Sequence, residues 1–306
     1  MTTKTWGERL QSFPLREFTL STGRVAWREA GRRVGSVRPI THVLLHGIGS
    51  NSANWLAQLE AASSNPNVYV VACDAPGYGR SDALPMPNPT AADYAERLLA
   101  WLDVLAAQDD DAHGLCRDNT RPSTIFPITL VGHSLGCLMA ASAARQMPER
   151  IKQLILLSPA QGYARARASE RDKKLQDRLD GLARLGPVGL AQSRGAAMLS
   201  PSAGADQVAF VQAAMAQINR AGYAQAARML AGGDLLSDLS QFCSGAVASA
   251  HLVSVASGSA DTITPPAGCQ QVAAHINAPY TSLGAVGHAC AVEAPDQVTR
   301  LIGLAA

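Results

Sequence analysis

A serine in a glycine-flanked turn is the strongest chemical signal in this sequence. Ser134 is the centre of the pentapeptide GHSLG at positions 132–136, a G-x-S-x-G pattern. The apolar run 128–131 before it predicts a strand, and the small and apolar residues after it predict a helix. A chain that turns abruptly from strand to helix strains the serine backbone and presents its hydroxyl at the carboxyl edge of a sheet. We therefore predict that Ser134 is a nucleophile.

An aspartate and a histidine further along the chain are the partners that such a serine needs. A hydroxyl is a poor nucleophile until a base takes its proton. Asp261 follows the predicted strand 252–256, and His288 follows the apolar stretch 280–286. Because all three residues follow strands, they can meet at one edge of a sheet. We predict that His288 takes the proton of Ser134, while Asp261 orients the imidazole and stabilises its charged form.

A glycine-rich turn, HGIGS at positions 46–50, directly follows the predicted strand 42–45. Attack on an acyl carbon places negative charge on its oxygen, which needs preorganised N–H donors. We predict that the backbone N–H groups of Ile48 and Leu135 form this oxyanion hole.

Three neighbours of these groups are predicted substrate contacts. Gly47 and Gly49 carry no side chain and allow the backbone to come close to a substrate, and His133 precedes the nucleophile. For His46 we expect a structural hydrogen-bonding role instead, because it occupies the loop itself.

The elements that must position these groups alternate along the chain. Two strands around a Ser-Thr-Gly turn form a predicted hairpin, and short apolar runs then alternate with longer amphipathic segments, which favours a mostly parallel sheet flanked by helices. A long block after the strand 154–157 has helical periodicity and no strand signal, so we expect a helical lid inserted above the sheet. The predicted division is a core of residues 1–160 and 246–306 and a lid (cap) of residues 161–245. The polar, acidic segment 108–126 is expected to be a surface loop.

Composition narrows the class of protein. Of the 306 residues, 47% are hydrophobic and 16% charged, with a net charge of +2, so the chain can bury a large core. No basic stripe interleaved with aromatics suggests a nucleic-acid partner, and the longest apolar runs are strand-sized, which predicts no membrane span. The six cysteines show no metal-ligand spacing. Without a secretory pattern at the start, we expect a cytoplasmic protein.

Together these motifs resemble a known superfamily. The segments LLHGIG, CDAPGYGRSD, LVGHSLG, SGSADTITPP and GHA are similar to those of the α/β-hydrolase superfamily of esterases, enol-lactonases, haloperoxidase-like enzymes and carbon–carbon bond hydrolases, over residues 16–305. The resemblance implies the α/β-hydrolase fold. AGYAQA at 221–226 with GDL at 233–235 resembles 3-oxoadipate enol-lactonases and neighbouring esterases. Two departures are Cys137, where many relatives repeat glycine, and His133, where ring-cleavage carbon–carbon hydrolases usually have Asn.

The predicted function is hydrolysis of a carboxylic ester or lactone of a small, largely apolar molecule through an acyl-serine intermediate, with no cofactor and no metal. The alternative is a carbon–carbon bond hydrolase of aromatic ring-cleavage products, which would need a lid cation for the substrate carboxylate. A ligand-binding protein that lost the chemistry is a third possibility. Three methionines suggest a hydrophobic pocket and five arginines are candidate cations: Met198, Met215 and Met229; Arg165, Arg167, Arg171, Arg194 and Arg228.

Overall fold

The computed structural model describes residues 4–31, 39–112, 127–244 and 252–305. An eight-stranded sheet runs through the centre, in the strand order β1-β2-β4-β3-β5-β6-β7-β8. The first two strands form the expected antiparallel hairpin and β2 is antiparallel to β4, whereas the pairs from β4 to β8 are all parallel. The predicted mostly parallel sheet is therefore confirmed. The strands are β1 (Arg16–Leu20), β2 (Gly23–Ala30), β3 (His42–Leu45), β4 (Val70–Cys73), β5 (Ile128–His133), β6 (Ile151–Leu157), β7 (Val253–Ser257) and β8 (Tyr280–Ser282).

The central strands are buried along their whole length. Every residue of β3, β4 and β5 is buried, which explains why their sequences are continuous apolar runs without an alternating pattern. Such strands need helices on both faces of the sheet to exclude water.

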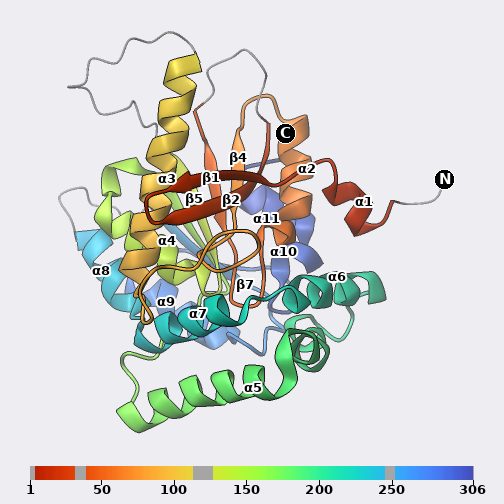
Figure 1. The fold of residues 1–306 in the computed structure, drawn as a ribbon, viewed down its shortest axis with the longest axis vertical. Helices are drawn as coiled ribbons and strands as arrows, with labels where there is room; N and C mark the ends of the chain where they lie inside the picture. Colours follow the sequence, from red (N-terminus) through yellow and green to blue (C-terminus); the bar gives the residue numbers. More distant parts are fainter. Residues whose placement is uncertain (1–3, 32–38, 113–126, 245–251, 306) are drawn as a thin grey trace.

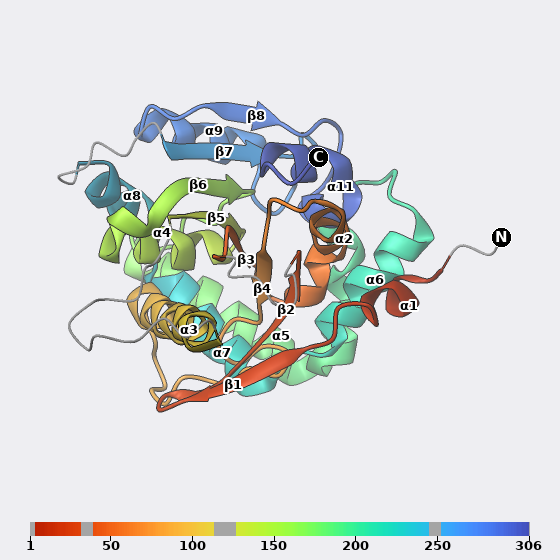
Figure 2. The same cartoon turned by 90° about the horizontal axis from the view of Figure 1, so that it is seen from above.

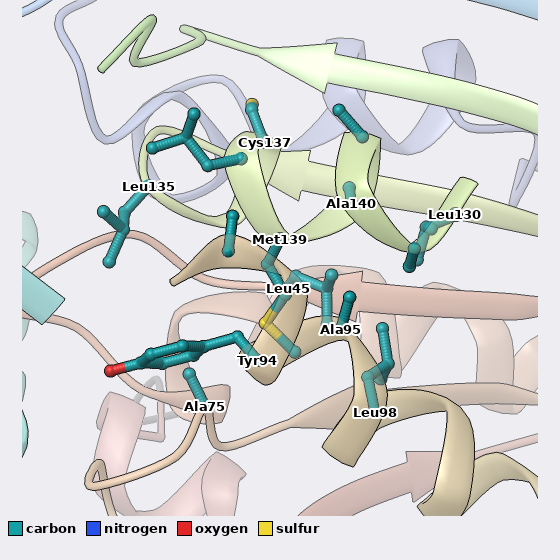
Figure 3. Close-up of a cluster of buried hydrophobic side chains, with 14 of the residues drawn as sticks. Leu45, Ala75, Tyr94, Ala95, Leu98, Leu130, Leu135, Cys137, Met139 and Ala140 are labelled. Atoms are coloured by element: carbon teal, nitrogen blue, oxygen red, sulfur yellow. The ribbon is translucent and has the colours of Figure 1, made fainter. Parts of the chain in front are cut away.

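Two groups of helices cover the two faces (Figure 2). Tyr94, Ala95 and Leu98 pack with Met139, Ala140 and the sheet residues in one large cluster (Figure 3). A second cluster fills the opposite face. One group contains α3 (Ala91–Ala112), α4 (Gly136–Gln146) and α9 (Pro266–His275). The other group contains α2 (Leu56–Ser64), α10 (Cys290–Glu293) and α11 (Pro295–Leu301). The helix α1 (Trp6–Leu10) precedes the sheet, and two short 3₁₀ turns are η1 (Ser52–Trp55) and η2 (Pro148–Arg150).

The segment between β6 and β7 is helical, and among its described residues no strand occurs. Its first three helices gather at one end of the molecule (Figure 1), whereas the fourth packs against α4, where Arg145 and Asp238 form an ion pair of 2.9 Å. Gly186, with φ of 64°, and Pro187 break the first helix. The elements are α5 (Ala168–Arg194), η3 (Ala196–Met198), α6 (Ala205–Ala216), α7 (Arg220–Gly232) and α8 (Leu235–Ser244).

One predicted boundary is wrong. The surface loop expected from Gln108 begins later, because α3 continues to Ala112; no glycine or proline interrupts the chain before Gly114. The rest of that segment, residues 113–126, lies outside the described residues. The last helix, α11, ends at Leu301, and Gly303 follows in the left-handed conformation with φ of 75°.

Candidate active site

Ser134 occupies a strained turn between β5 and α4. Its φ is 52°, a region that a non-glycine residue rarely adopts. The Ser134 N–H donates to the carbonyl of Leu157 at the end of β6, with an N···O distance of 2.9 Å, and its side chain borders a cavity. Strain of this kind persists only where the surrounding structure enforces it, and it is typical of functional sites.

The glycines on either side of the turn are required sterically. A Cβ on Gly132 would lie 2.7 Å from the Cα of Cys137, and one on Gly136 would lie 2.5 Å from the carbonyl oxygen of Leu45. Both distances are far below van der Waals contact, and the obstructing atoms are backbone. The close approach of strand and helix at this turn therefore depends on these two glycines.

His288 and Asp261 form a buried pair beside the same cavity. The Nδ1–H of His288 donates to Oδ2 of Asp261 across 2.9 Å, and both side chains are 1% exposed or less. Because Asp261 holds Nδ1, the Nε2 of a neutral His288 carries the lone pair and can act as a base. Ser134 and His288 border one cavity, so the structure brings together the three residues that the sequence predicted as partners.

The carboxylate of Asp261 is held by four hydrogen bonds. Its Oδ1 accepts the backbone N–H groups of Ile263 and Thr264, each at 2.9 Å, and its Oδ2 accepts from His288 and from the Thr264 hydroxyl, also 2.9 Å away. Burial by itself would raise the pKa of Asp261, but the hydrogen bond and charge of His288 and the Thr264 N–H lower the pKa to about 2. Asp261 is therefore ionised at neutral pH.

His133 lies behind His288 and does not border the cavity. The two rings are 4.8 Å apart, and the His133 Nε2–H donates to the backbone carbonyl of His288 across 2.8 Å. Burial and the nearby charge of His288 lower the pKa of His133 to about 3, so its ring is neutral. This placement argues against the predicted substrate contact and indicates that His133 holds the loop of His288 in place.

The two residues predicted to supply the oxyanion donors both lie at the cavity. Ile48 and Leu135 both border the cavity, and in the described part of the chain neither N–H donates to a protein acceptor. Gly49 also borders the cavity and has a φ of 79°. Gly47 does not border it, but a Cβ there would lie 2.9 Å from that of Ser134. Its role is to let the two turns approach each other.

His46 has the structural role that the sequence suggested. Its Nδ1–H donates to the Gly47 carbonyl across 2.8 Å, and its Nε2 accepts the N–H of Ala75 across 3.0 Å. Burial lowers the pKa of His46, which matches an imidazole that must keep one nitrogen unprotonated. In a trans peptide the Gly47 carbonyl and the Ile48 N–H point in opposite directions, so this bond also orients the predicted oxyanion donor.

A cavity of about 490 Å³ joins these groups to the helices between β6 and β7. Strand-end turns contribute Ser134 and His288. The helices α5 to α7 contribute Arg178, Leu190, Arg194, Met215, Tyr223 and Leu230. Met198 also borders the cavity, but Met229 is buried and does not. The volume suits a small molecule. In the described residues, no three His, Cys, Asp or Glu side chains are grouped so that they could hold a metal ion.

Two residues of the site were not predicted. Thr264 reaches both Asp261 and His288, and Asp-x-x-Thr is a spacing at which a side chain can fold back over its own turn. Arg178 borders the cavity from α5. The sequence offers one signal that could have identified Arg178. It lies three residues after Leu175 and four before Leu182, on the apolar stripe of that helix.

A comparison with protein families agrees with this geometry. Residues 43–301 match the sequence profile of the Alpha/beta hydrolase family. The chain belongs to this family. A fragment of 132 residues is 34% identical to an uncharacterised protein of Mycobacterium tuberculosis, a match that covers 43% of this chain and 32% of the relative. The chain therefore spans about a third of the length of that curated relative.

Solved structures confirm the α/β-hydrolase fold over nearly the whole chain. A thermophilic esterase from Thermogutta terrifontis superimposes with a TM-score of 0.74 at 20% identity, covering 94% of this chain and 96% of the esterase. The enol-lactonase from Burkholderia xenovorans superimposes with a TM-score of 0.70 at 20% identity, covering 94% and 98%. At such identities the likeness shows the fold alone. Among the described helices, none is long and apolar enough to cross a membrane.

Proposed function

We propose that this α/β hydrolase cleaves a carboxylic ester or lactone of a small, largely apolar molecule through an acyl-Ser134 intermediate. The observation that carries the proposal is the buried Asp261–His288 hydrogen bond of 2.9 Å beside the same cavity as a serine with a φ of 52°. A structural serine needs no strained backbone, and a structural aspartate–histidine pair needs no access to a cavity.

The proposed reaction has two halves. In the first, the Ser134 Oγ forms a bond to the acyl carbon while its proton moves to Nε2 of His288, and the bond to the leaving oxygen then breaks as His288 returns the proton to it. In the second, water loses a proton to His288 and attacks the acyl carbon, and Ser134 leaves with that proton. The ionised Asp261 stabilises the imidazolium in both halves, and the N–H groups of Ile48 and Leu135 receive the oxyanion.

The helices α5 to α7 are proposed as a lid over this site, within the predicted insert 161–245. Residues from each of them border the cavity opposite Ser134. A cover of apolar side chains would exclude water and strengthen the electrostatic interactions around the oxyanion. The cytoplasmic location predicted from the sequence stays a prediction.

Hydrolysis of 4-nitrophenyl acetate and butyrate tests the proposal. We expect the wild-type chain to release nitrophenolate and Ser134→Ala to lose about 10⁴-fold or more in kcat. The matched control is Ser142→Ala, which removes another buried hydroxyl from α4 and should retain most activity. An inactive wild-type chain, or a Ser134→Ala variant at the wild-type rate, would contradict the proposal.

Labelling with a fluorophosphonate separates this proposal from a binding protein without chemistry. The probe bonds to an activated serine only, so fragmentation mass spectrometry should locate it on Ser134 and not on Ser142. The carbon–carbon hydrolase alternative predicts instead that the absorbance of a coloured ring-fission product falls on mixing with the enzyme, while simple esters are not cleaved.

A further inference from the structure

The cavity beside Ser134 contains positive charge and no negative charge. Among the described residues that border it are the guanidinium groups of Arg178 and Arg194, and no aspartate or glutamate. The carboxylate of Asp261 lies behind His288 and is fully engaged by its four donors. Cations that border a largely apolar cavity are costly to keep unless an anion compensates them.

Arg178 is the more enclosed of the two cations. It is half-buried on α5, whereas Arg194 at the end of this helix is exposed. Burial by itself would lower the pKa of Arg178, but the neighbouring Tyr223 and Tyr163 hydroxyls raise it, so the guanidinium remains charged. Both tyrosines also border the cavity. In this part of the structure, no described carboxylate forms an ion pair with Arg178 or Arg194.

Other arginines near this region do have carboxylate partners. Arg165, one of the five arginines that the sequence offered as a substrate cation, pairs with Asp234 at 2.9 Å, and Arg171 lies 3.3 Å from Asp172. Neither borders the cavity. What distinguishes Arg178 from these arginines is that it borders the cavity and forms no ion pair with a described carboxylate.

We propose that Arg178, assisted by Arg194, binds a carboxylate on the substrate, away from the bond that is cleaved. The inference rests on the proposed function and narrows its substrate class to an ester or lactone with a free carboxylate, such as the half-ester of a short dicarboxylic acid. A guanidinium presents two parallel N–H donors that match the two oxygens of a carboxylate. The apolar side chains that line the same cavity suit the hydrocarbon chain that joins the two ends of such a molecule.

A pair of esters that differ in one group tests the inference. Monomethyl adipate carries the carboxylate, and methyl hexanoate has a methyl group in its place. We expect Arg178→Met to lower the ratio of kcat/KM for the anionic ester to that for the neutral one by about 10- to 100-fold, the range of a hydrogen bond to a charged group. Arg178→Lys, which keeps the charge but not the two parallel donors, should lose less.

The matched control is Arg184→Met. Arg184 is exposed on the same helix and does not border the cavity, so the variant changes the net charge equally and should leave both kcat/KM values unchanged. If esters are hydrolysed but Arg178→Met leaves the ratio at the wild-type value, the anion site is overturned and the proposed hydrolase stands.

Binding without chemistry provides the independent measurement. In Ser134→Ala, calorimetric titration should show binding of monomethyl adipate, and adding Arg178→Met should weaken the binding by about tenfold or more. If the wild-type chain cleaves neither ester while this Arg178-dependent binding is observed, the proposed hydrolase function is refuted and the proposed anion site is supported. Binding that does not change when Arg178 is replaced would overturn the anion site.

Discussion

Replacing Thr264 by valine tests whether this residue orients His288, because it leaves the other side chains of the site unchanged. The Thr264 hydroxyl lies 2.9 Å from Oδ2 of Asp261, 3.1 Å from Nδ1 of His288 and 3.1 Å from the carbonyl of Ser158. Valine keeps the branched shape but removes every one of these contacts. The backbone N–H of residue 264, which donates to Oδ1 of Asp261, stays in place.

The expected magnitude follows from the groups that lose a partner. The single proton of the Thr264 hydroxyl is shared between Oδ2 of Asp261 and the buried Ser158 carbonyl, so in the valine variant these two acceptors lose one donor between them. Leaving such groups unsatisfied costs about 1–3 kcal/mol, so the free energy of unfolding should fall by about 2 kcal/mol. If roughly 1.4 kcal/mol of this stabilisation orients His288 for proton transfer, kcat should fall about tenfold. KM should change less, because the Thr264 hydroxyl contacts Asp261 and Nδ1 of His288, although the residue also borders the cavity.

Ester hydrolysis and urea unfolding of Thr264→Val and Thr264→Ser provide the assay. Serine restores the hydroxyl without the methyl group, so Thr264→Ser should recover kcat to within about twofold of the wild type. A Thr264→Val variant with wild-type kcat would refute the positioning role. So would a Thr264→Ser variant as impaired as Thr264→Val, because the defect would then come from packing.

Two further predictions concern stability. Gly136→Ala places a Cβ 2.5 Å from the Leu45 carbonyl oxygen and should lower the free energy of unfolding in urea by about 2 kcal/mol or more. The control is Gly232→Ala, where a Cβ would meet nothing within 4 Å, and it should not lower the free energy of unfolding. Equal effects of the two substitutions would contradict the steric argument. The pKa of Asp261 is lowered from 3.8 to about 2, so its ionisation stabilises the fold above about pH 4 and this stabilisation is lost as the pH falls through 2. Between pH 5 and pH 3 the wild type should lose about 1 kcal/mol more than Asp261→Asn, and parallel unfolding curves would contradict this.

Local patterns predicted the elements and the order of the reactive residues. The run HVLL became β3 at its predicted bounds, because the three consecutive apolar residues after His42 suit a strand covered on both faces. The G-x-S-x-G motif predicted a strained serine, because glycines on both sides of it allow the close approach of strand and helix that a sharp turn requires. The φ of 52° at Ser134 agrees with this prediction. These features depend on neighbours within a few positions, so a single sequence contains them.

Contacts between distant segments required the tertiary structure. The local signals of Thr264 and Arg178, an Asp-x-x-Thr spacing and a place on an apolar helix stripe, are too common to assign a role. Their roles arise because parallel strands end at one edge and α5 passes over it. The same holds for His133, whose sequence position suggested a substrate contact although its Nε2 is engaged by a carbonyl 155 residues away.

What the sequence by itself determined was that Ser134, Asp261 and His288 each come after a strand, because the apolar runs that form those strands are local patterns. What only the tertiary structure decided was the cavity. Its volume, its apolar residues and its two arginines without a carboxylate partner depend on how α5 to α7 pack over the sheet edge. That packing is the sum of many weak, long-range contacts, and no short segment of the chain encodes it.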